Sequence, residues 1–387
     1  MFYVKNGKIF DCIDKEVILN GVNLGGWLLL EGWILAGRNI SETEFKKKFK
    51  EFNGEKELKK FEEKFYNTFI TEKDIKFIKE NLKLNCVRLP IHYKVIEKNF
   101  YLIKNFVFWC NKYKLYYILD LHALPGCQNY DWHSDSDGKS FFFKEKKFQH
   151  KYFSILEKLS SEFKNEKYLV GYDIMNEPVT KNLSSLKKVY SQAIKIIRKN
   201  NDKNIIFLEG NFWATDIKPF LEFLKYENVC ISIHYYYPIE FTFNFNKSLK
   251  YPSRNFNYNI IYKQLKKYYN LVGKNSVFVG EYGVNLRCEN SCFGEIQYLK
   301  DLTEIFNKFK FHRCYWTYKT ISNSIFPTGI LVYNKTSEFV SQHEKIFGWE
   351  KYIYNWKKMK KDIIAVWETK NYVLNSQIIN SINMNKE

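Results

Sequence analysis

Short apolar runs alternate with segments of helical periodicity along most of this chain. Between the runs, apolar residues recur every three or four positions, as in Leu183, Leu186, Tyr190, Ala193 and Ile197. Eight runs have the length and composition of buried strands: Val17–Asn23, Asn85–Leu89, Tyr116–Leu121, Tyr168–Met175, Asn204–Leu208, Val229–Ile233, Ser276–Val279 and Cys314–Thr317. Strands that alternate with helices favour a parallel sheet, and eight is the number that closes a barrel.

We therefore expect an α/β fold, a single-domain (β/α)8 TIM barrel spanning residues 17–375. Asn6-Gly7 between short apolar runs predicts a β-hairpin within residues 1–16, packed on the barrel. Residues 339–370 are interpreted as the last helix, and residues 376–387 as a C-terminal tail. No stretch rich in Pro, Gly or Ser marks a boundary to a second domain.

The charge of the chain is strongly basic, with 61 Lys and Arg against 42 Asp and Glu and a formal net charge of +19. Such a charge can attract nucleic acid. The basic residues, however, are mostly lysines spread among glutamates along helical segments, and no nucleic-acid-binding motif accompanies them. We expect no nucleic-acid partner.

A hydrophobic content of 45% and an aromatic content of 19% exclude a disordered chain.

Location and redox state are constrained only weakly. No apolar stretch approaches the roughly 18 residues of a membrane span, and the N-terminus lacks the basic and apolar regions of a signal peptide. We expect no membrane association and a cytoplasmic protein, or a secreted one if the chain is a processed form.

The eight cysteines contain no CxxC pair, so we expect mostly buried free thiols, with Cys288 and Cys292 as an open pairing. The oligomeric state stays open.

Polar residues occupy the ends of most of the predicted strands, where a buried strand would be expected to stay apolar. Catalytic groups of barrels lie at the carboxyl ends of the strands, so these residues should converge on one mouth. They are Arg88, His122, Asn176, Glu177, His234, Tyr236, Glu281 and Trp316. Each alone has an ordinary structural explanation, such as a solvated loop glutamate, a hydrogen-bonded histidine or a core tryptophan. Their joint occurrence at strand ends indicates a catalytic site.

Glu177 and Glu281 are the candidate catalytic pair. Cleavage of a glycosidic bond needs two carboxyl groups that flank the bond, one protonated and one ionised, with pKa values separated by their surroundings. Arg88 would hold one glutamate ionised, and the Tyr236 hydroxyl could donate to the same glutamate. Trp316 offers a flat face for a sugar ring. No cofactor or metal is required by this chemistry.

The ordered motifs resemble glycoside hydrolase family 5 (the cellulase superfamily), and within it the exo-β-1,3-glucanase type. The similarity runs from residue 21 to Trp316, most of the chain. Its markers are Gly21-Val22-Asn23-Leu24-Gly25-Gly26-Trp27, Asn85-Cys86-Val87-Arg88-Leu89-Pro90, Leu119-Asp120-Leu121-His122, Pro125-Gly126-Cys127-Gln128-Asn129, Asn176-Glu177-Pro178 and Gly280-Glu281-Tyr282-Gly283. Asn-Glu-Pro alone is moderately specific, whereas the ordered set is highly specific.

The resemblance implies a retaining β-glycoside hydrolase that acts on β-glucans or β-gluco-oligosaccharides. Glu177 would be the general acid/base and Glu281 the nucleophile, with Arg88 positioning and ionising Glu281. Asn176 would bind the 2-hydroxyl of the transferred sugar, and Trp316 would form the floor of its subsite. The other residues implied to bind substrate are Glu31, which would contact hydroxyls of the terminal sugar, and Asn129, His122, His234 and Tyr236.

The chain departs from the fungal exo-glucanases at two places. Gly32 follows Glu31 where those enzymes have proline, and a different loop, Tyr130 to Asp135, follows Asn129. The alternatives left open are β-1,4-glucanase, β-mannosidase-type and transglycosylase activities on the same site, and, more remotely, a non-catalytic carbohydrate-binding protein. Asp131, His133, Asp135 and Asp137 resemble a fragment of a calcium loop, but the remaining ligands are missing, so we expect no metal.

Overall fold

The computed structural model describes residues 1–288, 291–321, 325–333 and 348–384. Its strands are β1 (Tyr3–Lys5), β2 (Lys8–Phe10), β3 (Asn20–Asn23), β4 (Cys86–His92), β5 (Tyr116–Ala123), β6 (Leu169–Asp173), β7 (Ile205–Glu209), β8 (Val229–Tyr235), β9 (Val277–Tyr282), β10 (His312–Tyr315), β11 (Lys319–Thr320), β12 (Leu331–Tyr333) and β13 (Tyr372–Leu374).

Its α-helices are α1 (Glu42–Asn53), α2 (Glu55–Tyr66), α3 (Glu72–Glu80), α4 (Tyr93–Lys98), α5 (Phe100–Tyr113), α6 (Lys146–Phe163), α7 (Leu183–Lys199), α8 (Asn211–Ala214), α9 (Ile239–Thr242), α10 (Tyr258–Val272), α11 (Glu295–Phe309), α12 (Gly348–Trp367) and α13 (Ser376–Ile382). Three short 3₁₀ helices are η1 (Trp132–Ser134), η2 (Lys218–Lys225) and η3 (Thr369–Asn371). None of the helices among the described residues combines the length and the hydropathy needed to cross a bilayer.

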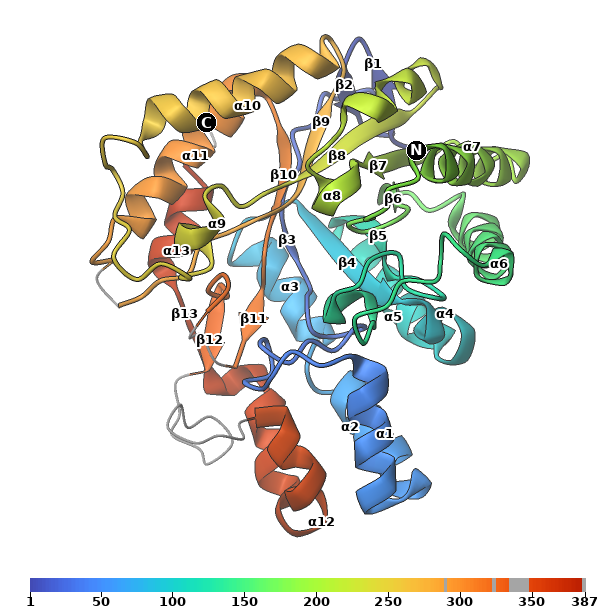
Figure 1. Ribbon diagram of the computed structural model, residues 1–387, viewed down its shortest axis with the longest axis vertical. Helices are drawn as coiled ribbons and strands as arrows, with labels where there is room; N and C mark the ends of the chain where they lie inside the picture. The colour runs from blue at the N-terminus through green and yellow to red at the C-terminus, as the bar shows by residue number, and fades with distance from the viewer. Residues whose placement is uncertain (289–290, 322–324, 334–347, 385–387) are drawn as a thin grey trace.

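Strands β3 to β10 form a closed parallel barrel, in which β10 pairs with β3 (Figure 1). Each predicted apolar run overlaps one of these strands, because residues buried on both faces of a parallel sheet are almost all apolar. The predicted (β/α)8 barrel is confirmed.

The surrounding helices turn one apolar face to the barrel. In α7 the buried side chains are Leu186, Val189, Tyr190, Ala193, Ile194 and Ile197, which follow the helical period of the sequence. Asn182 starts this helix, since its side-chain oxygen accepts the backbone N–H of Ser185 at 3.0 Å. The packing of these helices against the strands holds the carboxyl ends of the strands in fixed positions.

The N-terminal hairpin closes the amino end of the barrel. Strands β1 and β2 pair antiparallel around Asn6 and Gly7, both with positive φ, as a two-residue turn requires. Phe2 and Ile9 pack in one apolar cluster with barrel residues such as Ile118 and Phe278. The predicted hairpin is therefore present, and it lies at the end of the barrel opposite the strand carboxyl ends.

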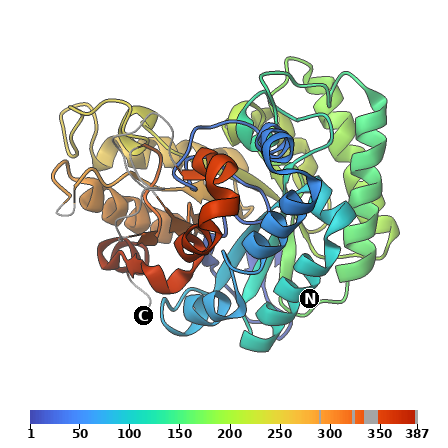
Figure 2. The same ribbon diagram turned by 90° about the horizontal axis from the view of Figure 1, so that it is seen from below.

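The chain beyond the barrel adds a three-stranded sheet, β11-β12-β13, and the helices α12 and α13. Helix α12 packs against α1 and α2, away from the barrel axis (Figures 1 and 2). The expected last helix begins at Gly348 in the described residues, and part of its predicted span, residues 339–347, lies outside them. Where we expected a tail, α13 buries Ile378, Ile379 and Ile382 and packs on α11.

Of the cysteines, Cys288 and Cys292 form a disulfide, the pairing that the sequence left open. Cys86, Cys110, Cys230 and Cys314 are free and buried.

Candidate active site

A cavity of about 720 Å³ opens at the carboxyl ends of the barrel strands. Its polar lining comes from strand ends and the loops that follow them: Glu31, His122, Asp131, His133, Glu177, His234, Tyr236 and Glu281. Its aromatic lining includes Trp33, Trp132, Trp213, Trp316 and Phe326. Side chains that are far apart in the sequence thus meet at one mouth, as the strand-end argument predicts.

Glu177 follows β6 and is fixed through its backbone as well as its side chain. Its φ of 47° lies in the left-handed region, and its N–H donates to Glu209 Oε2 at 2.6 Å. Its carboxylate contacts two imidazoles, His234 Nδ1 at 2.7 Å from Oε1 and His133 Nε2 at 3.3 Å from Oε2. Asn129 supports it from behind by donating to the Glu177 carbonyl oxygen at 2.9 Å.

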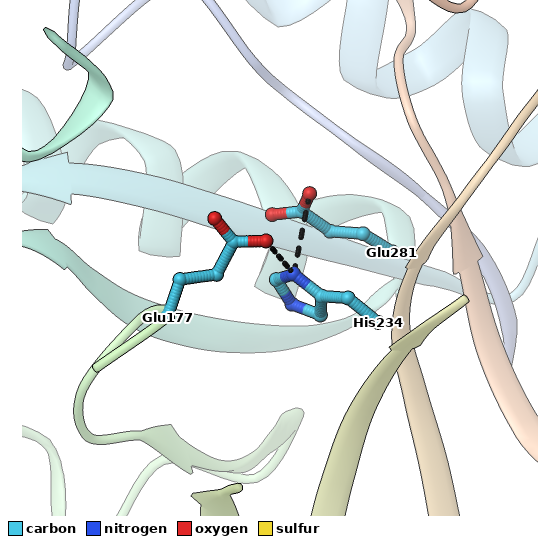
Figure 3. A group of neighbouring side chains, drawn as sticks. All are labelled: Glu177, His234 and Glu281. Atoms are coloured by element: carbon cyan, nitrogen blue, oxygen red, sulfur yellow. Dashed lines mark hydrogen bonds and ion pairs between the residues drawn. The ribbon is translucent and has the colours of Figure 1, made fainter. Parts of the chain in front are cut away.

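Glu281 lies on β9 among hydrogen-bond donors. Arg88 Nη1 is 3.0 Å from its Oε1, and the Tyr236 hydroxyl donates to its Oε2 at 2.9 Å. His234 Nδ1 is 3.5 Å from the same Oε2, so this imidazole stands between the two glutamates (Figure 3). Arg88, Tyr236 and His234 thus surround this carboxylate on one side of the site.

The two carboxylates face each other across a short gap (Figure 3). A carboxylate oxygen of Glu177, one of Glu281 and a ring nitrogen of His234 all lie within 4.8 Å of one another. The groups are close enough to hold a cation, but an imidazole proton already bridges to Glu177, as the 2.7 Å contact indicates. The arrangement leaves room for a bond to be attacked by one carboxylate and protonated by the other.

Arg88 is the centre of a buried charge network beneath the pocket. Its guanidinium contacts four carboxylates, Asp120, Asp173, Glu209 and Glu281, at 3.0 to 3.2 Å. It also donates to Asn23 Oδ1 at 3.1 Å and Asn176 Oδ1 at 2.9 Å. Both the Arg88 and the Asn176 side chains are buried and lie behind the cavity-lining residues.

The network contains more carboxyl groups than nearby cations, and their pKa values separate accordingly. Burial, together with the repulsion of Glu209, raises the pKa of Asp120 to about 8 and that of Asp173 well above its ordinary value. Burial opposes ionisation of Glu209 as well, but the charges of His234 and Arg88 outweigh it and lower its pKa to about 2. Within the network negative charge is thus concentrated on Glu209, which contacts both His234 and Arg88.

His122 is a neutral hydrogen-bonding group. Its Nδ1 is 2.6 Å from Asp120 Oδ2, and its Nε2 is 3.3 Å from the amide nitrogen of Asn176. Because an amide nitrogen only donates, Nε2 must accept, and the ring proton lies on Nδ1. Burial lowers the pKa of His122 to about 3, consistent with this tautomer. The Asn176 amide is thereby fixed between Arg88 and His122.

The protonation of Glu177 differs from the simple expectation of a protonated acid. Burial opposes its ionisation, but the hydrogen bond and charge of His234 and the charge of His133 outweigh burial and lower the pKa of Glu177. Burial also opposes charge on the imidazoles, yet the carboxylates around them raise the pKa of His133 to about 9 and that of His234 well above its usual range. In the free protein the protons therefore lie on the imidazoles.

Glu31 and Trp316 line the same cavity. Glu31 accepts the indole N–H of Trp33 at 2.9 Å, and its other oxygen, Oε1, is buried without a hydrogen-bond partner in the described part of the chain. Burial raises the pKa of Glu31 to about 7. Trp316 stacks on His122 with ring centroids 5.4 Å apart and planes inclined by 13°. An unpartnered acceptor and a flat ring suit a polyhydroxylated ligand.

The loop between β5 and α6 does not form the cation loop considered as an alternative. Asp135 turns away from the cavity to Thr43, His92 and Lys94. His133 turns towards it, 3.6 Å from Asp131 and 3.3 Å from Glu177.

Sequence reasoning missed four residues that shape the site. Glu209 ends β7, so the strand-end argument could have identified it. Asp173 lies inside a buried run, and nothing in the local sequence distinguishes it from a structural aspartate. Trp213 donates to Asp131 Oδ2 at 2.7 Å. His133 was considered from sequence only as a metal ligand. The roles of Trp213 and His133 depend on loop conformations that no spacing pattern encodes.

Comparison with known proteins agrees with this geometry. The sequence model of Cellulase (glycosyl hydrolase family 5) matches residues 43–322. A β-xylosidase of Phanerodontia chrysosporium is 31% identical over 82% of this chain and 70% of its own length. A probable glucan 1,3-β-glucosidase A of Emericella nidulans is 28% identical over 56% of this chain and 57% of its own.

In the fold, the crystal structure of a rutinosidase from Aspergillus niger superposes with a TM-score of 0.61 at 16% identity, covering 87% of this chain and 97% of that one. The family match spans well over half of the chain, and the strand-end residues that prompted the resemblance line the cavity, except Arg88 and Asn176, which lie behind it. This chain belongs to glycoside hydrolase family 5, a family of retaining enzymes, and it is a β-glycoside hydrolase.

Proposed function

We propose that the protein is an exo-acting glucan β-glucosidase of the β-1,3-glucanase type that works by double displacement. The observation that carries this is the pair Glu177 and Glu281, with oxygens within 4.8 Å and unlike surroundings. Such a short separation fits retaining hydrolysis, in which the carboxyl groups stand about 5–5.5 Å apart, and leaves too little room for the water of an inverting enzyme.

In the first step Glu281 attacks the anomeric carbon and Glu177 protonates the departing glycosidic oxygen. Arg88 and Tyr236 hold the two oxygens of Glu281 in place. In the second step Glu177 takes a proton from water, which releases the sugar from Glu281. We infer that the 2-hydroxyl reaches Asn176, whose amide is fixed by Arg88 and His122 behind the cavity lining, in a contact that strengthens in the transition state.

Exo action is supported by an aromatic wall beside Glu31. Trp33, Trp132 and Phe326 come from three different segments, and Phe326 contacts the other two, with ring centroids 5.2 Å from Trp33 and 5.7 Å from Trp132. A wall at this place blocks further sugar units beyond the one that Glu31 would bind. The cavity then accepts the non-reducing end of a chain rather than its middle.

The glucoside preference rests on relatives named glucan 1,3-β-glucosidase. A second candidate, β-xylosidase, is favoured by the name of the 31% identical relative. The two substrates differ only in the hydroxymethyl group of the sugar, so direct comparison of aryl β-glucoside and aryl β-xyloside turnover decides between them.

The test is product analysis with laminarin, short β-1,3-, β-1,4- and β-1,6-glucans, β-mannosides and the two aryl glycosides. Wild type should release single glucose units in the β-configuration, and Glu281→Gln should reduce turnover by roughly 10³-fold or more. Glu177→Gln should lose activity on glucans but keep much of the first step on dinitrophenyl glycosides, whose leaving group needs no acid. Glu51→Gln, at an exposed position of α1, is the matched control.

Release of longer oligosaccharides would contradict exo action, and inversion of configuration would contradict the double displacement. New glycosides that accumulate at high sugar concentration would instead identify a transglycosylase on the same residues.

A further inference from the structure

The loop between β5 and α6 brings a second imidazole to Glu177, and a role for this imidazole in turnover rests on the function proposed above. His133 Nε2 is 3.3 Å from Glu177 Oε2 and 3.6 Å from Asp131 Oδ2. Asp131 Oδ2 also accepts the indole N–H of Trp213 at 2.7 Å. Trp213, Asp131, His133 and Glu177 thus form a chain of contacts that ends on the catalytic acid.

We propose that His133 is a positioning residue that stores the proton of Glu177. In the free protein the pair holds one proton, on the His133 imidazolium. As the glycosidic bond breaks, this Nε2 proton passes to Glu177 and from Glu177 to the departing oxygen, which leaves His133 neutral and Glu177 ionised. When water attacks in the second step, its proton passes to Glu177 and from there back to His133. One proton leaves the pair with the departing group and one is taken from water, so the cycle restores the starting state.

The surroundings of Glu177 distinguish His133 from the other imidazole. The charged or titratable groups that surround Glu177 are Asp120 and His122 on β5, His234 on β8, Tyr236 after β8, Glu281 on β9, Glu209 on β7, Glu31 after β3, and Asp131 and His133 after β5. His234 stands between Glu177, Glu209 and Glu281, at 2.7, 3.2 and 3.5 Å. If His234 lost its proton, those buried carboxylates would be left without a compensating charge.

Loss of the His133 proton costs less free energy than loss of the His234 proton. Its carboxylate partner, Asp131, keeps the Trp213 hydrogen bond when the imidazole becomes neutral. The pKa of His133, about 9, is within reach of ordinary working conditions, whereas that of His234 is raised further by its three carboxylates.

Two groups in contact titrate as a pair, and the pair retains one proton until its upper pKa is passed. The alkaline limb of kcat/KM should therefore follow the pair and not Glu177 alone. Without His133 the limb should fall to the pKa of the isolated Glu177.

The experiment measures kcat/KM against pH on an unactivated alkyl β-glycoside and a dinitrophenyl β-glycoside. His133→Gln should move the alkaline limb of the alkyl substrate to lower pH by about one unit or more, a loss of roughly tenfold at about pH 8. Asp131→Asn should move it in the same direction by less. The dinitrophenyl substrate should respond weakly, and His150→Gln, at an exposed position of α6, should match wild type.

A limb that moves to higher pH would show that His133 acts only by its charge on Glu177, and an equal loss at all pH values would show a purely structural part. Either result overturns the proposal.

Nitrogen NMR of the histidine rings tests it without turnover. His133 should titrate near 9 in wild type and lower in Glu177→Gln; titration at or below about 6.5 in wild type would overturn the proposal. If wild type hydrolyses no β-glycoside, the proposed function fails while the NMR result still decides the state of His133.

Discussion

At the scale of single residues, Arg88 determines how charge is distributed in the site. A guanidinium presents five N–H donors in a rigid planar fork, and here that fork serves four carboxylates and two amides. Because the side chain is fully buried, the carboxylates among those acceptors depend on it for compensation of their charge. Glu281 is one of the four, so the state of the proposed nucleophile depends on the whole network.

Replacement of Arg88 by lysine should therefore be far from conservative. An ammonium group carries the charge at one point and cannot contact Asp173, Glu209 and Glu281 together, so buried carboxylates lose their partner. We expect Arg88→Lys to lower the free energy of unfolding by about 3 kcal/mol and kcat/KM by roughly 10²-fold or more. Urea unfolding and aryl-glycoside kinetics measure the two effects.

The exposed Arg254→Lys is the control for Arg88→Lys and should stay within about 0.5 kcal/mol of wild type. Wild-type stability and activity in Arg88→Lys would show that the fork geometry is dispensable.

The sequence identified the residues at strand ends because a barrel brings those ends together regardless of their spacing. It did not show which of these residues would contact the substrate and which hold other residues in position. Asn129 was expected to bind substrate, yet its amide is occupied by the backbone of Glu177 and Asp131. That distinction depends on side-chain direction within a loop, which the sequence pattern does not encode.

At the scale of elements, the loop from β5 to α6 is held to the barrel by Asp135. Its side chain is 6% exposed and contacts the Thr43 hydroxyl and N–H, the His92 ring and the Lys94 ammonium. The same loop carries Asp131 and His133 on its other side. An anchor on one side thus fixes the position of the groups that face Glu177.

Asp135→Asn should weaken this anchor in a pH-dependent way. Burial opposes ionisation of Asp135, but His92, Lys94 and Thr43 outweigh it and lower its pKa. A carboxyl with a lowered folded pKa contributes stability that is present above its ordinary pKa, about 3.9, and is lost as the pH falls through the folded value. The variant should therefore lose about 2 kcal/mol near neutral pH and approach wild type below about pH 3.

Thermal unfolding across this pH range provides the measurement, with the exposed Asp137→Asn of the same loop as control. A stability difference that does not change with pH would assign the effect to packing instead of charge.

The long elements were predictable from sequence because their periodicity extends over many residues. Among the short elements, the three-residue strands β1 and β2 were predictable only through the Asn6-Gly7 turn between them. Strand β11 has two residues and β12 and β13 have three each, too few for an alternation to be recognised. Helix α13 escaped notice because its apolar residues Ile378, Ile379 and Ile382 lie in a short polar stretch near the chain end. They become recognisable only through their packing on α11.

At the scale of the whole molecule, Lys319 joins the three-stranded sheet beside the barrel to helices from distant parts of the chain. It lies on β11 and is fully buried. Its ammonium donates to the carbonyl oxygens of Phe69, after α2, and Trp367, at the end of α12, at 2.7 and 2.6 Å. The rings of Phe69 and Tyr372 lie within 4.5 Å of it. Three segments distant in sequence therefore meet at one buried amine.

Burial lowers the pKa of Lys319 to about 7, against about 10.4 in an unfolded chain. Between these values the unfolded state binds more protons than the folded state, so the free energy of unfolding rises with pH. Lys319→Met keeps the apolar stem and removes the titration, so wild type should gain about 2 kcal/mol over this variant between about pH 7 and about pH 9. Lys357→Met, exposed on α12, should keep the wild-type slope in urea unfolding. Parallel curves for wild type and Lys319→Met would mean that the buried amine keeps its proton throughout, with its hydrogen bonds and aromatic neighbours compensating fully for the loss of water.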